Sequence, residues 1–233
     1  MKMRSNNYKI VAIVPARAGS KRVPGKNTRD FMGQSLISWS IKAALKSSFV
    51  TEVIVSTDDE QVKAIAGKYN VTAFDRPPEL ANDKAVLDDV IENIDSQIVN
   101  KPDGYALLQP TSPLRHSNTI DDAIKKLFSG RDADRLIEVS NLKIFSGRVL
   151  EGLWHPDFPE NTRSQELPQI WFPTGGLYVY KRSYFQKRNF HPIVTKASEI
   201  PECRVVNIDY EQDFNRAEEV FTRFKNDYAY LLT

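Results

Sequence analysis

Apolar and polar residues alternate in blocks along the first 140 residues, and the blocks follow two different periods. Short apolar runs predict buried strands at 10–14, 52–56, 71–74 and 105–108. Between them, apolar residues recur at helical spacing and predict amphipathic helices at about 34–47, 59–69, 84–98 and 118–128. Strands that alternate with helices are typical of βαβ units, so we expect a doubly wound, mostly parallel α/β sheet.

Three unusual loops directly follow predicted strands. Their sequences are Pro-Ala-Arg-Ala-Gly-Ser-Lys-Arg at 15–22, Ser-Thr-Asp-Asp at 56–59 and Gln-Pro-Thr-Ser-Pro-Leu-Arg at 109–115. Right-handed crossovers place such loops along one edge of a parallel sheet, where ligands bind. We therefore expect the three loops to line one crevice.

The regular pattern ends at about residue 141 and returns after residue 173. Glycine and proline punctuate this stretch, and its aromatic residues Trp154, Phe158 and Trp171 argue against disorder. We expect residues 141–173 to form an excursion that packs against another subunit. Strands are then predicted at 177–180 and 204–208, and a last helix at 211–224, all within a single domain of 233 residues.

Composition narrows the classes of partner and compartment. The 32 basic and 30 acidic residues give a net charge of only +2, so any anion site is local and nucleic acid is not an expected partner. Cys203 is the sole cysteine, which excludes an internal disulfide and fits a reducing cytoplasm. No apolar stretch approaches the roughly 20 residues of a membrane span, so no membrane partner is expected.

The loop after the first strand carries the features of an oligophosphate site. Gly19 and Gly25 allow close backbone approach, and four cations stand in the same loop: Arg17, Lys21, Arg22 and Lys26. Exposed backbone N–H groups and fixed positive charge are what phosphate binding requires. The alternative is a solvated basic turn. The spacing is neither that of a Walker A loop nor that of a dinucleotide-binding G-x-G-x-x-G.

The string PARAGSKRVPGKN resembles the N-terminal signature of the N-acylneuraminate (sialic acid) cytidylyltransferase family, P-A-R-x-G-S-K-x-x-x-x-K-N. The 109–115 loop matches a second family pattern, Q-P-T-S-P-[LF]-R, and the resemblance covers residues 10 to 225. It implies a Rossmann-like nucleotidyltransferase fold with a small dimerisation excursion. It also implies CMP transfer from CTP to a 2-keto nonulosonic acid, with release of pyrophosphate, and a cytoplasmic homodimer. Mg²⁺, with Mn²⁺ as the alternative, is the implied cofactor.

Two looser matches come from the middle and the end of the chain. Residues 76–83 resemble R-P-x-E-L-A-x-D, which borders the nucleobase pocket in relatives, although a polyproline linker with a helix cap at Asp83 fits too. Residues 84–88 lack the small hydroxyl residues of relatives, so only Arg76 and Ala85 are carried over. Asn207 and Asp209 stand where the family has two metal-binding aspartates. Asp209 as a helix cap is the alternative.

The acceptor side departs further from the family. Residues 163–168 and 174–179 resemble its sugar-acid and dimer region, but Phe172 stands where an arginine is common and Thr174 replaces asparagine. These departures favour a different nonulosonic acid over a lost activity. Legionaminate, pseudaminate and Kdo are the alternative acceptors, and a nucleotide-binding scaffold with decayed catalysis is the non-enzymatic alternative.

The resemblance, read residue by residue, implies a role for each candidate. The catalytic candidates are Arg17, Lys21, Gln109 and Asp209. The nucleotide-binding candidates are Ala16, Arg17, Ser20, Lys21, Asn27, Arg76 and Ala85. The acceptor-binding candidates are Gln109, Thr111, Ser112 and Arg163, and the metal candidates are Asp209 and, more weakly, Asn207. Arg115 is suited to bind a carboxylate, unless it stabilises its own turn.

Overall fold

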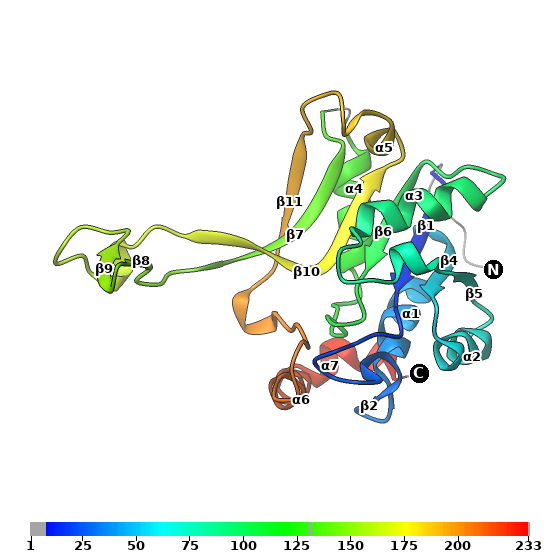
Figure 1. The fold of residues 1–233 in the computed structure, drawn as a ribbon, viewed down its shortest axis with the longest axis horizontal. Helices are drawn as coiled ribbons and strands as arrows, with labels where there is room; N and C mark the ends of the chain where they lie inside the picture. The colour runs from blue at the N-terminus through cyan, green and yellow to red at the C-terminus, as the bar shows by residue number, and fades with distance from the viewer. Residues whose placement is uncertain (1–7, 131, 233) are drawn as a thin grey trace.

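The fold is built on a sheet of seven strands, in a computed structural model that describes residues 8–130 and 132–232 (Figure 1). The strand order is β11-β7-β10-β6-β1-β4-β5. The strands are β1 (Ile10–Pro15), β4 (Val50–Thr57), β5 (Thr72–Asp75), β6 (Gly104–Leu108), β7 (Arg135–Leu142), β10 (Ile170–Lys181) and β11 (Thr195–Glu199). Only β10 runs antiparallel to its neighbours in this sheet, which confirms the mostly parallel α/β class.

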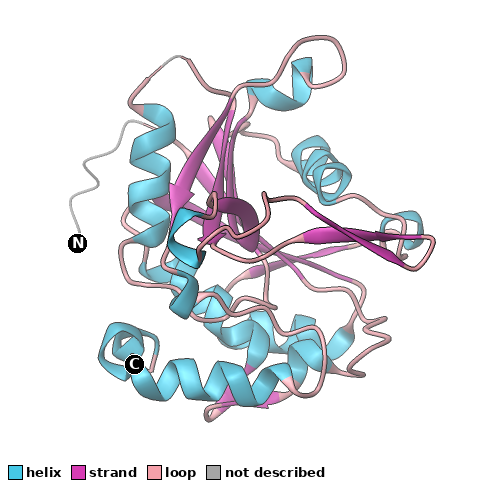
Figure 2. Cartoon of the chain, turned by 90° about the vertical axis from the view of Figure 1, so that its left-hand side faces the viewer, coloured by secondary structure: helices cyan, strands magenta, loops and turns pink. Residues whose placement is uncertain are grey.

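Helices cover both faces of the sheet (Figure 2). They are α1 (Leu36–Lys46), α2 (Glu60–Lys68), α3 (Leu87–Gln97), α4 (Thr119–Phe128), α5 (Ser183–Lys187), α6 (Asp213–Arg223) and α7 (Lys225–Tyr228). Alternate residues of β1 enter two separate cores: Ala12 packs on the side of α1, α4 and α6, and Ile13 on the side of α3. The uninterrupted apolar run of β1 is explained by this burial on both faces.

Short elements connect the layers. They are η1 (Lys26–Thr28), the hairpin strands β2 (Asp30–Phe31) and β3 (Gln34–Ser35), η2 (Pro78–Leu80), η3 (Ser164–Glu166), η4 (Glu202–Arg204) and η5 (Ala229–Leu231). The hairpin turns through Met32 and Gly33, both at positive φ, as a two-residue turn requires.

The predicted excursion is an arm that leaves the sheet along β7 and β10. These strands stay paired as far as Ile170 and Leu142, and the arm ends in the hairpin of β8 (Gly147–Leu150) and β9 (Leu153–Pro156) (Figure 1). Its exposed apolar side chains include Val149, Leu153 and Trp154. The use of this arm by a second subunit stays a prediction.

The strand predicted at 204–208 is wrong. Residues 202–204 form η4, and the following residues are extended without a strand ladder. Val206 and Ile208 are apolar because they fill the core beside α6, and Ile208 N–H donates a single bond to the Thr111 carbonyl at 2.8 Å. The sheet edge is formed instead by β11, whose polar sequence Thr-Lys-Ala-Ser-Glu carries no hydrophobic signal.

The sequence pattern also missed β7. Its centre holds Glu138, which is 5% exposed, and a buried carboxylate contradicts the apolar pattern by which buried strands are recognised. The Thr174 hydroxyl donates to Glu138 Oε1, and burial raises the pKa of this carboxyl.

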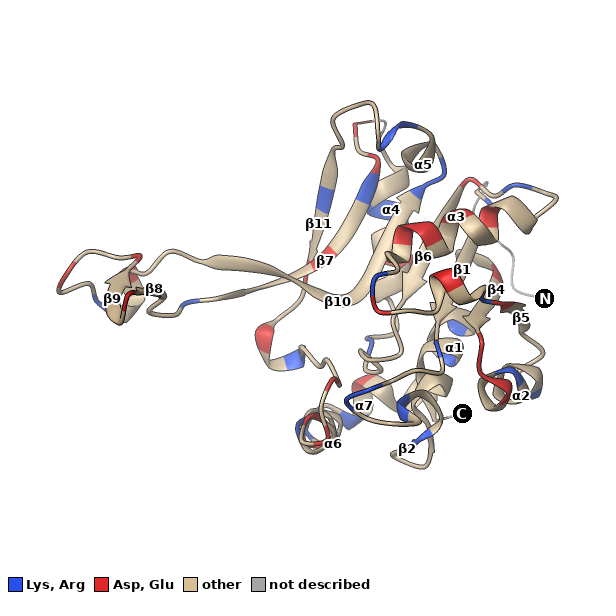
Figure 3. Cartoon of the chain, in the orientation of Figure 1, with Lys and Arg blue, Asp and Glu red and all other residues tan. Residues whose placement is uncertain are grey.

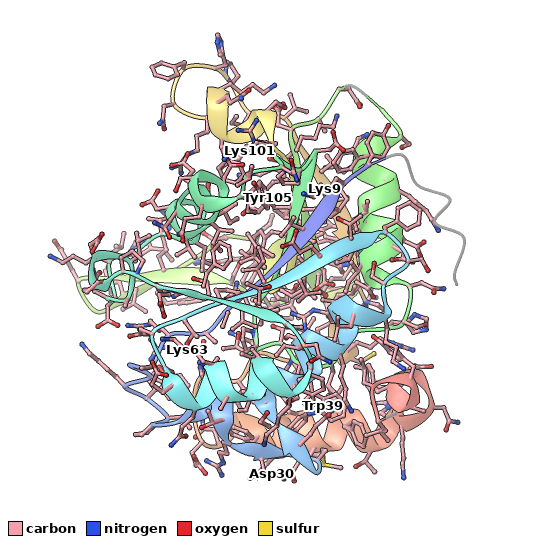
Figure 4. All side chains as sticks on the ribbon, turned by 90° about the vertical axis from the view of Figure 1, so that its right-hand side faces the viewer. Lys9, Asp30, Trp39, Lys63, Lys101 and Tyr105 are labelled. Atoms are coloured by element: carbon pink, nitrogen blue, oxygen red, sulfur yellow. The ribbon has the colours of Figure 1, made fainter. Side chains whose placement is uncertain are left out.

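Asp95 of α3 is held by three side chains, and we expect it to contribute stability that acid removes. Arg182 donates to its two oxygens at 2.8 and 3.1 Å, while Tyr105 and Lys101, labelled in Figure 4, also contact it. Burial alone would raise the pKa of Asp95, but the hydrogen bonds from Arg182 and Tyr105 outweigh burial and lower it. The contribution is therefore complete above the ordinary carboxyl pKa, about 3.9, and is lost as pH falls through the lower folded value.

Asp95→Asn should lower the free energy of unfolding at pH 7 by about 1–2 kcal/mol. The deficit should shrink as pH falls below about 4. Urea unfolding at several pH values measures this effect, with Asp122→Asn on the exposed face of α4 as the control. If the free energies of unfolding of wild type and Asp95→Asn changed in parallel with pH, the proposed pH-dependent contribution of Asp95 would be contradicted.

Candidate active site

A cavity of about 510 Å³ lies at the carboxyl ends of β1 and β6. The loop after β1 supplies most of its lining, the loop after β6 supplies Gln109, Pro110 and Thr111, and Arg76, Asp83, Leu87 and Asp209 complete it. Figure 3 shows basic residues in blue along the loop that leads from β1 toward β2. The cavity is where an open parallel sheet binds its ligand.

The lining carries an excess of positive charge. Five cations face two carboxylates: Arg17, Lys21, Arg22, Lys26 and Arg76 against Asp83 and Asp209. All four cations of the basic loop thus line the cavity, as expected for an oligophosphate site. An excess of cations in a concave site attracts a polyanion.

Asp83 joins the two cations at the front of the loop. Arg17 Nη2 lies 2.5 Å from Asp83 Oδ1, and Lys21 Nζ lies 2.5 Å from Oδ2. Hydrogen bonds from Lys21 and Arg17 lower the pKa of Asp83. Asp83 does not cap α3, since that helix begins at Leu87 with Val86 at its N-cap. The interpretation of Asp83 as a helix cap is therefore wrong.

The backbone of the basic loop is anchored from behind. Ala16 N–H donates to the Ser56 carbonyl at 2.9 Å, and Ala18 N–H donates to Asp58 Oδ1 at 2.8 Å. Asn27, which lines the cavity and is nearly buried, donates its amide to the Arg17 carbonyl at 3.2 Å. The 56–59 loop thus holds the site without lining the cavity, which corrects the prediction that all three loops line it.

Arg76 is a buried cation on the cavity wall. Its Nε donates to Ser56 Oγ at 3.2 Å and its Nη2 to the Ser56 carbonyl at 3.1 Å. Burial lowers its pKa to about 10, so it keeps its charge at neutral pH. Ser20 lines the same cavity from the basic loop.

Asp209 also lines the cavity and is contacted by two cations and one amide. Lys26 Nζ lies 3.2 Å from Oδ1, Arg22 Nη1 lies 3.8 Å from Oδ2, and the Asn207 amide donates to Oδ2 at 3.0 Å. Asp209 is not a helix cap. The residue at the N-cap of α6 is Gln212, and the Asp209 N–H donates to the Asp213 carboxylate at 2.8 Å. The Asp209 side chain lines the cavity.

Asp209 and Asn207 both carry side-chain oxygen atoms, which are the atoms that would ligate the predicted metal ion. The described residues contain no cluster of three or more His, Cys, Asp or Glu side chains able to hold a metal ion. One carboxylate with an amide oxygen nevertheless suits Mg²⁺, which takes few protein ligands and keeps waters or phosphate oxygens.

Arg115 stabilises the loop after β6, and its guanidinium is buried against protein acceptors, which favours the turn-stabilising alternative over a carboxylate ligand. It is 3% exposed, and its guanidinium donates to the Gly176 carbonyl at 2.6 Å, the Gln109 carbonyl at 2.8 Å and Ser40 Oγ at 2.9 Å. The register of β10 against β7 shifts between Pro173 and Tyr178, and the Gly176 carbonyl lies in this irregular stretch. Arg115 thereby joins the loop of Gln109 to the irregular stretch of β10.

Five predicted site residues lie outside the cavity lining: Ala16, Ala85, Ser112, Arg163 and Asn207. Ser112 is buried, and its hydroxyl has no hydrogen-bond partner among the described residues. Ala85 lines a separate depression beside Asn82 and Asp89, and Arg163 is exposed on the arm before η3. The sequence assigned no role to Leu87, which lines the cavity, or to Asp83 as a counterion. The match of residues 76–83 to R-P-x-E-L-A-x-D placed Asp83 near the site but gave it no cation partner.

The mostly parallel sheet, with a cationic cavity at its carboxyl edge, defines an α/β protein of the Rossmann-like class. Within that class, the chain belongs to the cytidylyltransferase family, whose model, described as "Cytidylyltransferase", matches residues 11–227.

Relatives of known name fall into the same family. The chain is 45% identical over 217 residues to N-acylneuraminate cytidylyltransferase of Escherichia coli O18:K1:H7, covering 90% of this chain and 51% of that protein. It is 40% identical over 225 residues to pseudaminic acid cytidylyltransferase of Campylobacter jejuni serotype O:2, covering 91% and 96%. The chain spans about half the length of the N-acylneuraminate cytidylyltransferases it matches.

A solved structure supports the fold. CMP:2-keto-3-deoxy-manno-octonic acid synthetase, in complex with CTP, superposes with a TM-score of 0.71 at 18% identity, covering 92% of this chain and 99% of that one. Within the described residues, no helix has the length and apolar character needed to cross a bilayer.

Proposed function

We propose that the chain transfers CMP from CTP to a 2-keto nonulosonic sugar acid and releases pyrophosphate. The observation that carries this proposal is the cavity, in which five cations face two carboxylates beside the family's basic loop. Membership of the cytidylyltransferase family and the names of the relatives support it.

In the reaction, the anomeric hydroxyl of the acid attacks the α-phosphorus of CTP. A new O–P bond forms, the bond between the α-phosphorus and its bridging oxygen breaks, and pyrophosphate leaves with the electron pair. The proton of the attacking hydroxyl is released to water. The protein contributes positioning and charge stabilisation, because phosphoryl transfer asks for little covalent chemistry.

Each part of the cavity has a role in this proposal. Arg17 and Lys21 neutralise the charge that builds on pyrophosphate, and Ser20 with backbone N–H groups of the loop binds the phosphates. Asn27 and Arg76 contact the cytosine. Gln109 and Thr111, which line the cavity from the loop after β6, orient the acceptor.

We propose Mg²⁺ as the cofactor, with Mn²⁺ as the alternative. Asp209 and the amide oxygen of Asn207 would hold it, and when bound it supplies positive charge to the triphosphate. Lys26 contacts Asp209 and would place its ammonium beside the same phosphates.

Asn207→Asp should lower the Mg²⁺ concentration needed for half-maximal CTP binding by roughly 10-fold, because a second carboxylate strengthens the metal site. Titration of CTP binding against Mg²⁺ measures the effect apart from turnover. Asn215→Asp, exposed on α6, adds the same charge outside the cavity and is the control. An unchanged Mg²⁺ dependence would count against Asn207 as a metal neighbour.

The arm suits a second copy of the chain, because its exposed apolar side chains need a partner. Arg163 lies on the arm, so a role toward the acceptor depends on such a copy. We expect a dimer mass by light scattering. Leu153→Glu with Trp154→Glu should shift the mass to that of a monomer, and a wild-type monomer would exclude the arm interface.

The direct test is pyrophosphate release from CTP and Mg²⁺ with N-acetylneuraminate, legionaminate, pseudaminate or Kdo. Release with one acid would establish the reaction and the acceptor. If CTP binds but no pyrophosphate is released with any of the four acids, the result would favour a nucleotide-binding scaffold without catalysis or an acceptor outside this set. A cytoplasmic location stays a prediction.

A further inference from the structure

Asp83 has no role in the proposed reaction, although it contacts two residues that do. Each of its carboxylate oxygens lies 2.5 Å from a different cation, Arg17 on one side and Lys21 on the other. Both cations belong to the loop that would bind the triphosphate, so Asp83 stands where a phosphate group would find its counterions.

The segment that carries Asp83 is organised mainly by its own hydrogen bonds. The Asn82 carboxamide accepts from Lys84 N–H at 2.8 Å and from Ala85 N–H at 3.1 Å, and it donates to the Glu79 carbonyl at 2.6 Å. In the described part of the chain, the hydrogen bonds and ion pairs from residues 79–86 to the basic loop all pass through Arg17 and Lys21. Loss of these bonds would therefore free the segment from the loop without breaking its internal turn.

Exposure makes this contact easy to exchange. The side chains of Asp83 and Lys21 are 47% and 80% exposed, and exposed ion pairs are weak because water screens them. A single carboxylate offers one negative charge, whereas a triphosphate offers several and more oxygens, so the triphosphate wins the competition for the same two cations.

We propose that Asp83 is a built-in competitor of the triphosphate. Its carboxylate holds Arg17 and Lys21 in the free protein and is displaced when CTP enters. When pyrophosphate leaves, Asp83 regains both cations and so favours product release. This inference rests on the proposed function only for the identity of the displacing ligand; the competition itself concerns any polyphosphate.

The test uses inorganic tripolyphosphate as the probe, with no nucleotide, acceptor or metal. Asp83→Asn should bind tripolyphosphate about fivefold more tightly than wild type by isothermal titration calorimetry. The gain should shrink in 0.5 M NaCl, because salt screens exposed charges. Glu79→Gln removes a charge from the same segment without touching Arg17 or Lys21, and its affinity should stay within about twofold of wild type.

Equal or weaker binding by Asp83→Asn, or no binding of tripolyphosphate to either protein, would overturn the proposal. Weaker CTP binding by Asp83→Asn with Mg²⁺ present would instead make Asp83 a metal ligand and overturn it as well. Since the probe is not a substrate, failure of the proposed transferase reaction leaves this result readable.

Discussion

Replacing Arg17 with alanine is expected to lower the rate of pyrophosphate release from CTP by about 10²-fold or more. The guanidinium lines the cavity, where the proposed reaction would build charge on the leaving group. The loop backbone should keep its place without the side chain, because Ala16 and Ala18 are held by Ser56 and Asp58. The loss should therefore fall on the transition state rather than on folding.

Steady-state pyrophosphate release measures this effect, with the acceptor that supports turnover. Arg17→Lys should recover part of the rate, since it restores the charge without the fork of donors. Arg29→Ala is the matched control, because Arg29 pairs with Glu211 outside the cavity lining. A rate for Arg17→Ala within a few-fold of wild type would refute the role.

Arg115→Leu is expected to cost about 3 kcal/mol or more of the free energy of unfolding. The substitution removes the guanidinium that donates to the Gly176 carbonyl, whereas the Gln109 carbonyl keeps the Ser112 N–H and the Ser40 hydroxyl. It also removes the cation whose charge counteracts the rise in the pKa of Glu138 that burial causes. Both are costs of unpaired polar groups in a dry interior.

Urea unfolding at pH 7 measures the loss. Arg216→Leu, on the exposed face of α6, removes an arginine that pairs with Glu202 at the surface and should change stability little. Arg115→Lys should lie between wild type and Arg115→Leu. A loss below about 1 kcal/mol for Arg115→Leu would show that water replaces the guanidinium.

The sequence predicted best those helices and strands whose position is decided by the burial of apolar side chains alone. β1 is apolar throughout because both of its faces are buried, and the helices up to α4 show one apolar stripe each. β7 and β11 were missed because other causes decide them. β7 tolerates Glu138 through the Thr174 hydroxyl, and β11 gains its place by pairing with β7 along one edge.

The candidate site likewise contains features that the sequence predicts and features that it does not. The place of the four cations in the cavity could be predicted because they belong to one loop that directly follows a buried strand. Their pairing with Asp83 and Asp209 could not be predicted, because these carboxylates lie far along the chain and reach the loop only through the fold. The burial of Arg115 could not be predicted either, because the same turn sequence is compatible with a buried or an exposed arginine.

The place of β10 constrains the order in which the sheet can be assembled during synthesis. β5, β4, β1 and β6 are complete by residue 108, but β7 cannot join them, because β10 lies between β6 and β7 and ends at Lys181. Until then β6, a strand of buried residues, presents an unpaired edge, the kind of surface on which nascent chains aggregate. The ribosome must therefore supply more than 60 further residues before the most apolar edge of the sheet is covered.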